Sequence, residues 1–315
     1  MRPWVAWALL LGGLSAVSLC VGATSIFTGE LDAGWILAIS RFPRTAAALL
    51  TGVGLALAGV VVQQSVQNRM VEPSLIGTPE AAMLGLLAIT LLAPGAAIVT
   101  KMSVAAVAAL LGMGLFLLIA RAIPRHDPML LPIIGLIYGG ILFSSAIWIA
   151  WTTDLMQYLG TWRLGEFSGV MQGRYEMLWI VAIIALLLYA IADRITLLGF
   201  GEAQARSLGL NYAQTRGIGL AAVAVITAVI VVTVGYLPFV GLLAPNIVSR
   251  WRGDNLRANL PVVAALGAAS VLSADILGRV LRPPYEIPAG TIFAVFGACV
   301  FLWMLNARPA RRAHG

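Results

Sequence analysis

The chain has 315 residues, of which 60% are hydrophobic and only 10% are charged, and its mean hydropathy is +0.95. Soluble domains carry about 25% charged residues, so this composition excludes a soluble globular protein, which would leave too much apolar surface in water. The net charge of +7 and the pI near 10.0 would suit a nucleic-acid partner, but the arginines lie in short turns between apolar runs, a pattern typical of membrane topology.

Apolar runs separated by turn signals predict an all-α membrane protein with about ten spanning helices in a single domain, residues 1–315. The run 241–248 is too short to cross about 30 Å of hydrocarbon, so we expect protein to shield it from lipid. In chain order the predicted spans are 4–23, 45–66, 77–92, 98–120, 129–150, 177–192, 212–235, 241–248, 260–280 and 287–306.

The first predicted span, 4–23, is longer than the apolar core of a usual signal peptide and is expected to be retained. An amphipathic stretch at 156–171 is expected to lie at the membrane interface. Cys20 and Cys299 lie far apart in apolar runs, which argues against a disulfide or a metal site and favours packing roles.

Most of the 20 Lys and Arg residues fall in loops on the side of the N-terminus. The positive-inside rule therefore predicts that both termini are cytoplasmic. Arg41, Arg44, Arg279 and Arg282 fall on the outer side instead. Each alone could snorkel to lipid phosphates, but four in two loops favour a docking surface for carboxylates, which guanidinium groups bind in a bidentate manner.

Polar side chains are scarce in the predicted spans. Those that could line a wide, weakly polar pathway are Gln63, Gln64, Gln67, Ser144 and Ser145. The three glutamines lead into a turn at 68–77 that reads Asn-Arg-Met-Val-Glu-Pro-Ser-Leu-Ile-Gly.

The segment 198–209 reads Leu-Gly-Phe-Gly-Glu-Ala-Gln-Ala-Arg-Ser-Leu-Gly. Glu202 and Arg206 are spaced i, i+4, which supports a short helix, and Gly209 is placed to end it. A short helix between two spans offers a soluble partner a projection to act on, whereas a solvated amphipathic turn is the simpler alternative.

Asp275 lies four residues before Arg279, so the two can pair on one helical face. An unpaired acid in a span would be a candidate proton site, but the arginine favours a structural ion pair. The only lysine, Lys101, follows Thr100, so there is no Gly-Lys-Ser/Thr phosphate loop and ATP binding is not expected. His126 and His314 have no Cys or His neighbours, and we expect no metal site and no cofactor.

These motifs, in this order, resemble the FecCD/BtuC-type permease subunits of ABC importers for iron-siderophores, haem and vitamin B12. The matches run from Arg41-Phe-Pro-Arg44 to Glu286-Ile-Pro-Ala-Gly290. The family turn is Asn-Pro-Leu-Ala-x-Pro followed by Gly; this chain matches its Asn, second Pro and Gly, but Arg69 replaces the first Pro. The family coupling pattern, Gly-Glu-x-x-Ala-x-x-Leu-Gly, is matched at Gly201, Glu202, Ala205, Leu208 and Gly209.

The resemblance implies a type II ABC importer permease fold in the bacterial inner membrane, and alternating access driven by two copies of a separate ATPase. It implies that the ATPase contacts residues 201–209, including Arg206, and that Asn68 and Met70 help to close the cytoplasmic end of the pathway. Arg41, Arg44 and Arg279 would meet acidic residues on the two lobes of a periplasmic or lipoprotein substrate-binding protein.

The Asn-Arg-x-Val-Glu-Pro-Ser variant looks like permeases for ferric catecholate-type siderophores and favours a heterodimer with a second permease. A homodimer that carries haem or cobalamin is the alternative, since no residue pattern in the predicted spans indicates a particular ligand. A proton-coupled secondary transporter would need membrane acids without partners, for which Asp275 and Glu80 are the candidates. A structural scaffold would not need a helix of the coupling type.

Overall fold

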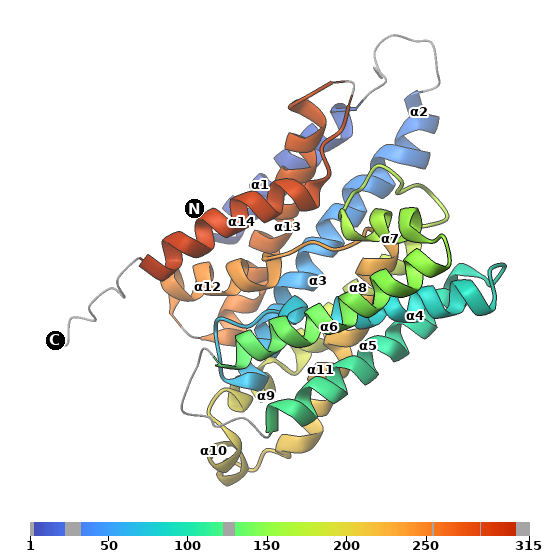
Figure 1. Ribbon diagram of the computed structural model, residues 1–315. Coiled ribbons are helices and arrows are strands. Elements are labelled where there is room, and N and C mark those ends of the chain that lie inside the picture. The colour runs from blue at the N-terminus through green and yellow to red at the C-terminus, as the bar shows by residue number, and fades with distance from the viewer. Residues whose placement is uncertain (1–2, 23–32, 122–129, 254, 284, 307–315) are drawn as a thin grey trace.

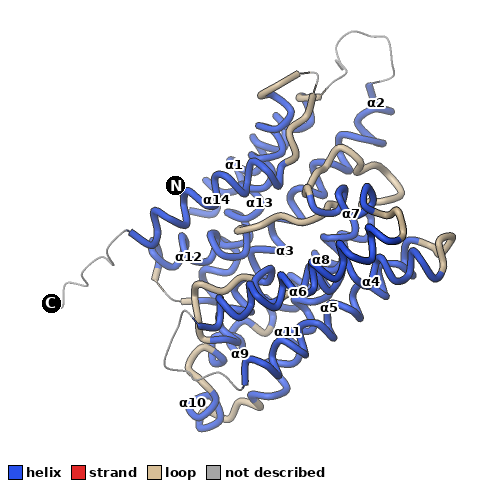
Figure 2. The backbone as a smooth tube through the Cα atoms, in the orientation of Figure 1, coloured by secondary structure: helices blue, strands red, loops and turns tan. Residues whose placement is uncertain are grey.

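The computed structural model describes residues 3–22, 33–121, 130–253, 255–283 and 285–306, and every regular element in these ranges is a helix (Figures 1 and 2). The all-α prediction is confirmed. His126 and His314 lie outside the described residues.

The first half of the bundle contains α1 (Pro3–Cys20), α2 (Ala33–Ile36), a π-helical turn (Leu37–Arg41), α3 (Phe42–Val66), α4 (Thr78–Leu92), α5 (Ile98–Arg121), α6 (Leu130–Thr152) and α7 (Met156–Arg163). The second half contains α8 (Trp179–Ala190), α9 (Ala192–Leu198), α10 (Glu202–Ser207), α11 (Tyr212–Thr233), α12 (Val240–Arg252), α13 (Leu256–Val280) and α14 (Ala289–Asn306). Short 3-10 turns occupy Pro73–Ile76 and Glu176–Leu178.

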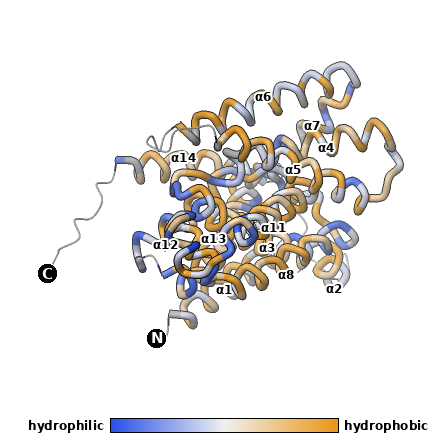
Figure 3. Tube along the Cα trace, turned by 90° about the horizontal axis from the view of Figure 1, so that it is seen from below, coloured by the Kyte–Doolittle hydropathy of each residue, from blue (hydrophilic) through white to orange (hydrophobic). Residues whose placement is uncertain are grey.

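Five helices in the described ranges are long and apolar enough to cross a membrane: Gly34–Val66, Ile98–Ala120, Ile133–Thr152, Tyr212–Thr233 and Leu256–Val280. A sixth span forms if α8 and α9, which meet at 71°, are taken together, and shorter apolar helices cover Trp4–Cys20, Thr78–Leu92 and Ala289–Met304. The arrangement is compatible with the ten predicted spans. Figure 3 shows apolar residues along the outer helices and hydrophilic ones concentrated at turns and helix ends.

The second predicted span starts too late, because the chain is already helical from Gly34. Pro43 has no N–H and leaves the carbonyl four residues earlier, at Ile39, without its helical partner. The N–H of Gln172 donates to that carbonyl at 2.9 Å. A contact from a distant segment thus lets the helix pass a residue that, in sequence, suggests a start.

The amphipathic stretch 156–171 is helical only over Met156–Arg163. The chain beyond it bonds to other segments: the Glu166 N–H donates to Val234 O at 2.9 Å, and the Gly290 N–H donates to Gly165 O at 2.8 Å. The second half of this stretch is thus a bonded loop, and the interfacial position expected for 156–171 stays a prediction. The packing roles expected for Cys20 and Cys299 are wrong within the chain, because both are exposed free thiols.

The core is organised around α3, which packs against α8, α11, α12 and α13. Gly52 faces the backbone of Gly267 in α13, and Gly59 faces that of Gly241 in α12, so closely that neither glycine has room for a Cβ. Small residues permit this approach where lipid supplies no hydrophobic force between helices. Every residue of α12 from Val240 to Asn246 is buried, as expected for a short helix that protein shields from lipid.

Replacing Gly59 by Val should separate α3 from α12 and destabilise the protein. Overpacking of a tight core typically costs about 1–3 kcal/mol, and the neighbour here is backbone that cannot rotate away. Thermal unfolding in detergent measures the loss. Gly114→Val in α5 is the matched control, since nothing lies within 4 Å of a Cβ there; equal melting temperatures for the two variants would contradict the packing argument.

Candidate functional site

Charged side chains gather at the end of the bundle where α3 begins, here called the Arg44 end. Asp275 accepts from Arg44 Nη2 at 2.7 Å and from Arg279 Nη2 at 2.7 Å, and Arg44 Nη1 lies 2.9 Å from Glu286 Oε2. Two positive and two negative charges therefore form a closed cluster. Such pairing is what makes charges tolerable beside hydrocarbon, so the structural Asp275–Arg279 pair is confirmed.

The same cluster holds the end of α1. Arg279 Nη1 donates to the carbonyls of Ser18 and Val21 at 2.9 and 2.7 Å, and Arg41 Nη1 donates to Leu19 O at 3.0 Å. The last carbonyls of a helix have no intrahelical partner. Two arginines from other helices supply the missing donors.

The predicted docking arginines are therefore not all surface charges. Arg41 and Arg279 are buried and the Arg44 side chain is 13% exposed, whereas Arg282 is exposed, with its guanidinium 5.8 Å from the Tyr285 ring. Asp275, Glu286 and the α1 carbonyls already engage three of these four guanidinium groups. A role in docking stays a prediction.

At the opposite end of α3, here called the Val66 end, the helix stops in a left-handed residue, Gln67, with φ 55°. The Asn68 N–H donates to Gln63 O at 3.1 Å, and Asn68 Oδ1 accepts from the Met70 N–H at 2.9 Å. Gln63 is buried and its amide donates to Gly241 O at 3.3 Å. These bonds fix the direction in which the 68–77 turn leaves the helix.

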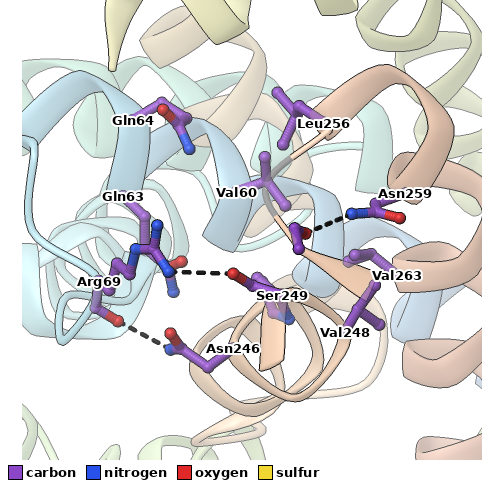
Figure 4. Close-up of a pocket in the computed structure, with 12 residues that line it drawn as sticks. Val60, Gln63, Gln64, Arg69, Asn246, Val248, Ser249, Leu256, Asn259 and Val263 are labelled. Atoms are coloured by element: carbon purple, nitrogen blue, oxygen red, sulfur yellow. Dashed lines mark hydrogen bonds between the residues drawn. The ribbon is translucent and has the colours of Figure 1, made fainter. Parts of the chain in front are cut away.

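A cavity of about 60 Å³ opens at this end between α3, α12 and α13 (Figure 4). Arg69 bridges the turn to α12: its Nη1 donates to Ser249 Oγ at 3.0 Å, and its carbonyl accepts from Asn246 Nδ2 at 2.8 Å. The polar lining comes from Gln63, Gln64, Arg69, Asn246, Ser249 and Asn259. Three of these polar residues, Asn246, Ser249 and Asn259, were not predicted from the sequence. The wide, weakly polar pathway expected from the sequence stays a prediction.

Ser144 and Ser145 lie elsewhere, in an exposed face of α6 that also carries Ile137, Ile141 and Trp148. Ser145 Oγ donates to Ile141 O within the helix at 2.9 Å. The structure does not bring these serines together with the glutamines in one cavity. Their role as pathway lining remains a prediction.

The segment 198–209 has the predicted local structure. Helix α10 begins at Glu202, which pairs with Arg206 at 2.7 Å, and Gly201 and Gly209 flank it with φ of 93° and 81°. Non-glycine residues rarely adopt such angles, which explains why glycines bracket this helix. Leu208 is exposed and Ala205 is buried, so the segment presents one face outward and packs the other.

Two acids, Glu72 and Glu80, have buried carboxylate oxygens. From the sequence Glu80 was a candidate proton site, whereas Glu72 had no predicted role. Glu72, in the turn, accepts from the Phe239 N–H at 3.2 Å and from the Ser74 hydroxyl, and it thereby ties the turn to the start of α12. Burial raises the pKa of Glu72, which these hydrogen bonds oppose. Glu80 Oε2, in α4, is buried and has no hydrogen-bond partner among the described residues. The adjacent Pro73 and Pro79 were the available signal, since they place both acids at helix starts.

The long apolar helices and the internally paired charges define a multi-pass membrane protein. Residues 5–307 match the FecCD transport family, and the chain belongs to that family.

Relatives match over nearly the whole chain. The petrobactin import system permease protein FatD of Bacillus anthracis is 38% identical, covering 99% of this chain and 93% of the relative, and the petrobactin import system permease protein YclN of Bacillus subtilis is 42% identical, covering 93% and 96%. The vitamin B12 import system permease protein BtuC of Escherichia coli O157:H7 is 33% identical, covering 96% of each. An inward-facing metal-chelate type ABC transporter has the same fold, with a TM-score of 0.82, 24% identity and coverage of 96% and 97%.

Asp275→Asn should destabilise the protein strongly, because it leaves Arg44 and Arg279 facing each other across an uncharged amide. Removing one partner of a buried pair typically costs about 3–5 kcal/mol. Arg282→Ala should change the free energy of unfolding by less than about 0.5 kcal/mol, as for most surface substitutions. Denaturant unfolding in detergent compares the two variants, and a mild effect of Asp275→Asn would show that the cluster is not structural.

Proposed function

We propose that this chain is the permease subunit of a binding-protein-dependent ABC importer that moves a ferric siderophore across the bacterial inner membrane. The observation that carries the proposal is its similarity over nearly its full length to permeases of petrobactin import systems, at 38% and 42% identity. ATP hydrolysis belongs to a separate subunit. The chain itself has no phosphate-loop sequence.

The mechanism we propose is alternating access. Two ATPase subunits act on residues 201–209, and the resulting motion opens and closes a pathway at the Val66 end, where Asn68 and Met70 lie in the turn and Gln63 and Gln64 line the cavity. Ser144 and Ser145 would line the same pathway from α6. A weakly polar lining suits a cargo that must be released, since tight binding would slow its exit.

The partners we propose are a second homologous permease and a periplasmic or lipoprotein substrate-binding protein that docks at the Arg44 end. Among the four predicted docking arginines Arg282 is the exposed one, and Arg44 is held by its ion pairs. The start of α1 and the end of α14 support a shared side for the termini, since Trp4 and Trp303 lie 6.0 and 5.6 Å from Arg252 and Arg250 at the end of α12. We place that side in the cytoplasm, following the arginine distribution.

Haem or cobalamin import is a second candidate, because vitamin B12 permeases are 33% identical over 96% of this chain. Proton-coupled transport has one observation in its favour, the buried Glu80 carboxylate oxygen without a hydrogen-bond partner in the described structure. Family membership and the α10 segment favour ATP-driven transport. The transport activity of a Glu80→Gln variant distinguishes proton-coupled from ATP-driven transport. Proton-coupled transport would be lost with the carboxyl group, whereas ATP-driven transport would continue.

The double variant Glu202→Lys with Gly209→Pro should uncouple ATP hydrolysis from uptake. Lysine breaks the ion pair with Arg206, and proline cannot adopt the φ of 81° that ends α10. In proteoliposomes containing the complete importer, uptake per ATP hydrolysed should fall about five-fold or more. Gly217→Ala, at an open helical position, is the control. Normal uptake by the double variant would remove the coupling assignment.

A strain lacking this permease should lose growth on a ferric catecholate-type siderophore as sole iron source and keep growth on haem. The expectation follows from the siderophore relatives and from the Asn68-Arg69 variant of the turn. Affinity purification of the chain should recover a second, non-identical permease. Loss of growth on haem alone, with recovery of a homodimer, would reverse the cargo assignment.

A further inference from the structure

The short helix α10 is tied into the bundle and does not hang free. Leu198 at the end of α9, Ala205 in α10 and Tyr212 at the start of α11 form a buried cluster, with Leu210 packed against it. The Leu210 N–H also donates to Ala205 O at 3.0 Å. A displacement of α10 must therefore carry the end of α9 with it, because close-packed side chains transmit strain.

Two amide side chains from the Val66 end of α3 meet this segment. Gln64 Oε1 lies against Gly199 so closely that no Cβ could be added there, and Gln67 Nε2 is 2.7 Å from the position of a Cβ at Gly201. Gln67 Nε2 also donates to Gly199 O at 3.5 Å. Helix α9 packs directly on α3. The glutamines thus fill the space that the two glycines leave open.

The same end of α3 controls the 68–77 turn. Gln67 is the left-handed residue at which the helix becomes the turn. Arg69, two residues later, is held on α12 through Ser249 and Asn246. A chain of direct contacts therefore runs from α10 through Gly199 and Gly201 to the glutamines, and from there into the turn.

We propose that Gln64 and Gln67 are positioning residues that link the 198–209 segment to the 68–77 turn, so that the two move as one body. The sequence predicted both as pathway lining, whereas these contacts give them a mechanical role. The inference rests on the proposed function, because it needs residues 201–209 to receive the ATPase motion. A steric link of this kind works without charge, so it should be insensitive to ionic strength.

The decisive experiment replaces the link by a covalent bond. In a Cys20→Ser, Cys299→Ser background, the complete importer carrying Gln64→Cys and Gly199→Cys is reconstituted in proteoliposomes. With the cysteines reduced, the uptake per ATP hydrolysed should fall about five-fold or more, which is the low end of the usual coupling between two sites. The rate of ATP hydrolysis and the thermal stability should stay unchanged. Oxidised to the disulfide, the importer should regain uptake, because the segment and α3 again move together.

Normal uptake by the reduced pair, no gain on oxidation, or failure of the two cysteines to cross-link would each overturn the inference. Gln64→Cys with Gly217→Cys is the matched control, since Gly217 has no neighbour within 4 Å of a Cβ, and oxidation should not restore its uptake. Gln67→Ala should give the same fall in uptake per ATP as the reduced pair. If the importer with both native cysteines replaced shows no ATP-driven uptake, the proposed function is wrong. If that importer takes up its cargo and the Gln64 and Gln67 variants do so equally well, only the proposed mechanical link is wrong.

Discussion

The structure depends on how closely α3 can approach its neighbours. Lipid is as apolar as the side chains, so helices in a membrane associate through fit and contact area. Gly52 and Gly59 bring α3 against the backbones of α13 and α12. That approach buries α12, a helix of 13 residues that could not cross the membrane unaided. With α12 fixed, its polar residues Asn246 and Ser249 come within reach of the turn that follows α3.

The two ends of α3 are held by different kinds of interaction. At the Arg44 end, four charges from three segments cancel, and Arg279 of this cluster, together with Arg41, also donates to carbonyls at the end of α1. At the Val66 end, the contacts use amides, a hydroxyl and backbone groups around one arginine. A closed ion cluster resists separation because each charge would be stranded. Neutral hydrogen bonds of about 1 kcal/mol net are easier to exchange, which suits the end proposed to open.

Apolar run length and turn residues were enough to predict the helical bundle, the shielded run 241–248 and the short helix bracketed by Gly201 and Gly209. These features depend on local composition and backbone angles, which a sequence carries directly. The start of the second span at Gly34 was missed because Gln172, far along the chain, donates to the Ile39 carbonyl that Pro43 cannot serve. The burial of Arg41 and Arg279 was missed for the same reason, since their partners at Ser18, Leu19 and Val21 lie at the end of α1, far away in the sequence.

The glutamines show that residue type alone gives only part of a role. An amide in an apolar span suggests a polar lining, but its meaning depends on what it touches. Gln64 and Gln67 touch glycines in a segment more than 130 positions later, where any larger residue would occupy their space. A contact formed by packing transmits a push over a short range and costs no desolvation of charge. Such a contact suits the boundary between a membrane helix and a segment moved from outside it, because the side chains of the helix touch the backbone of the segment directly.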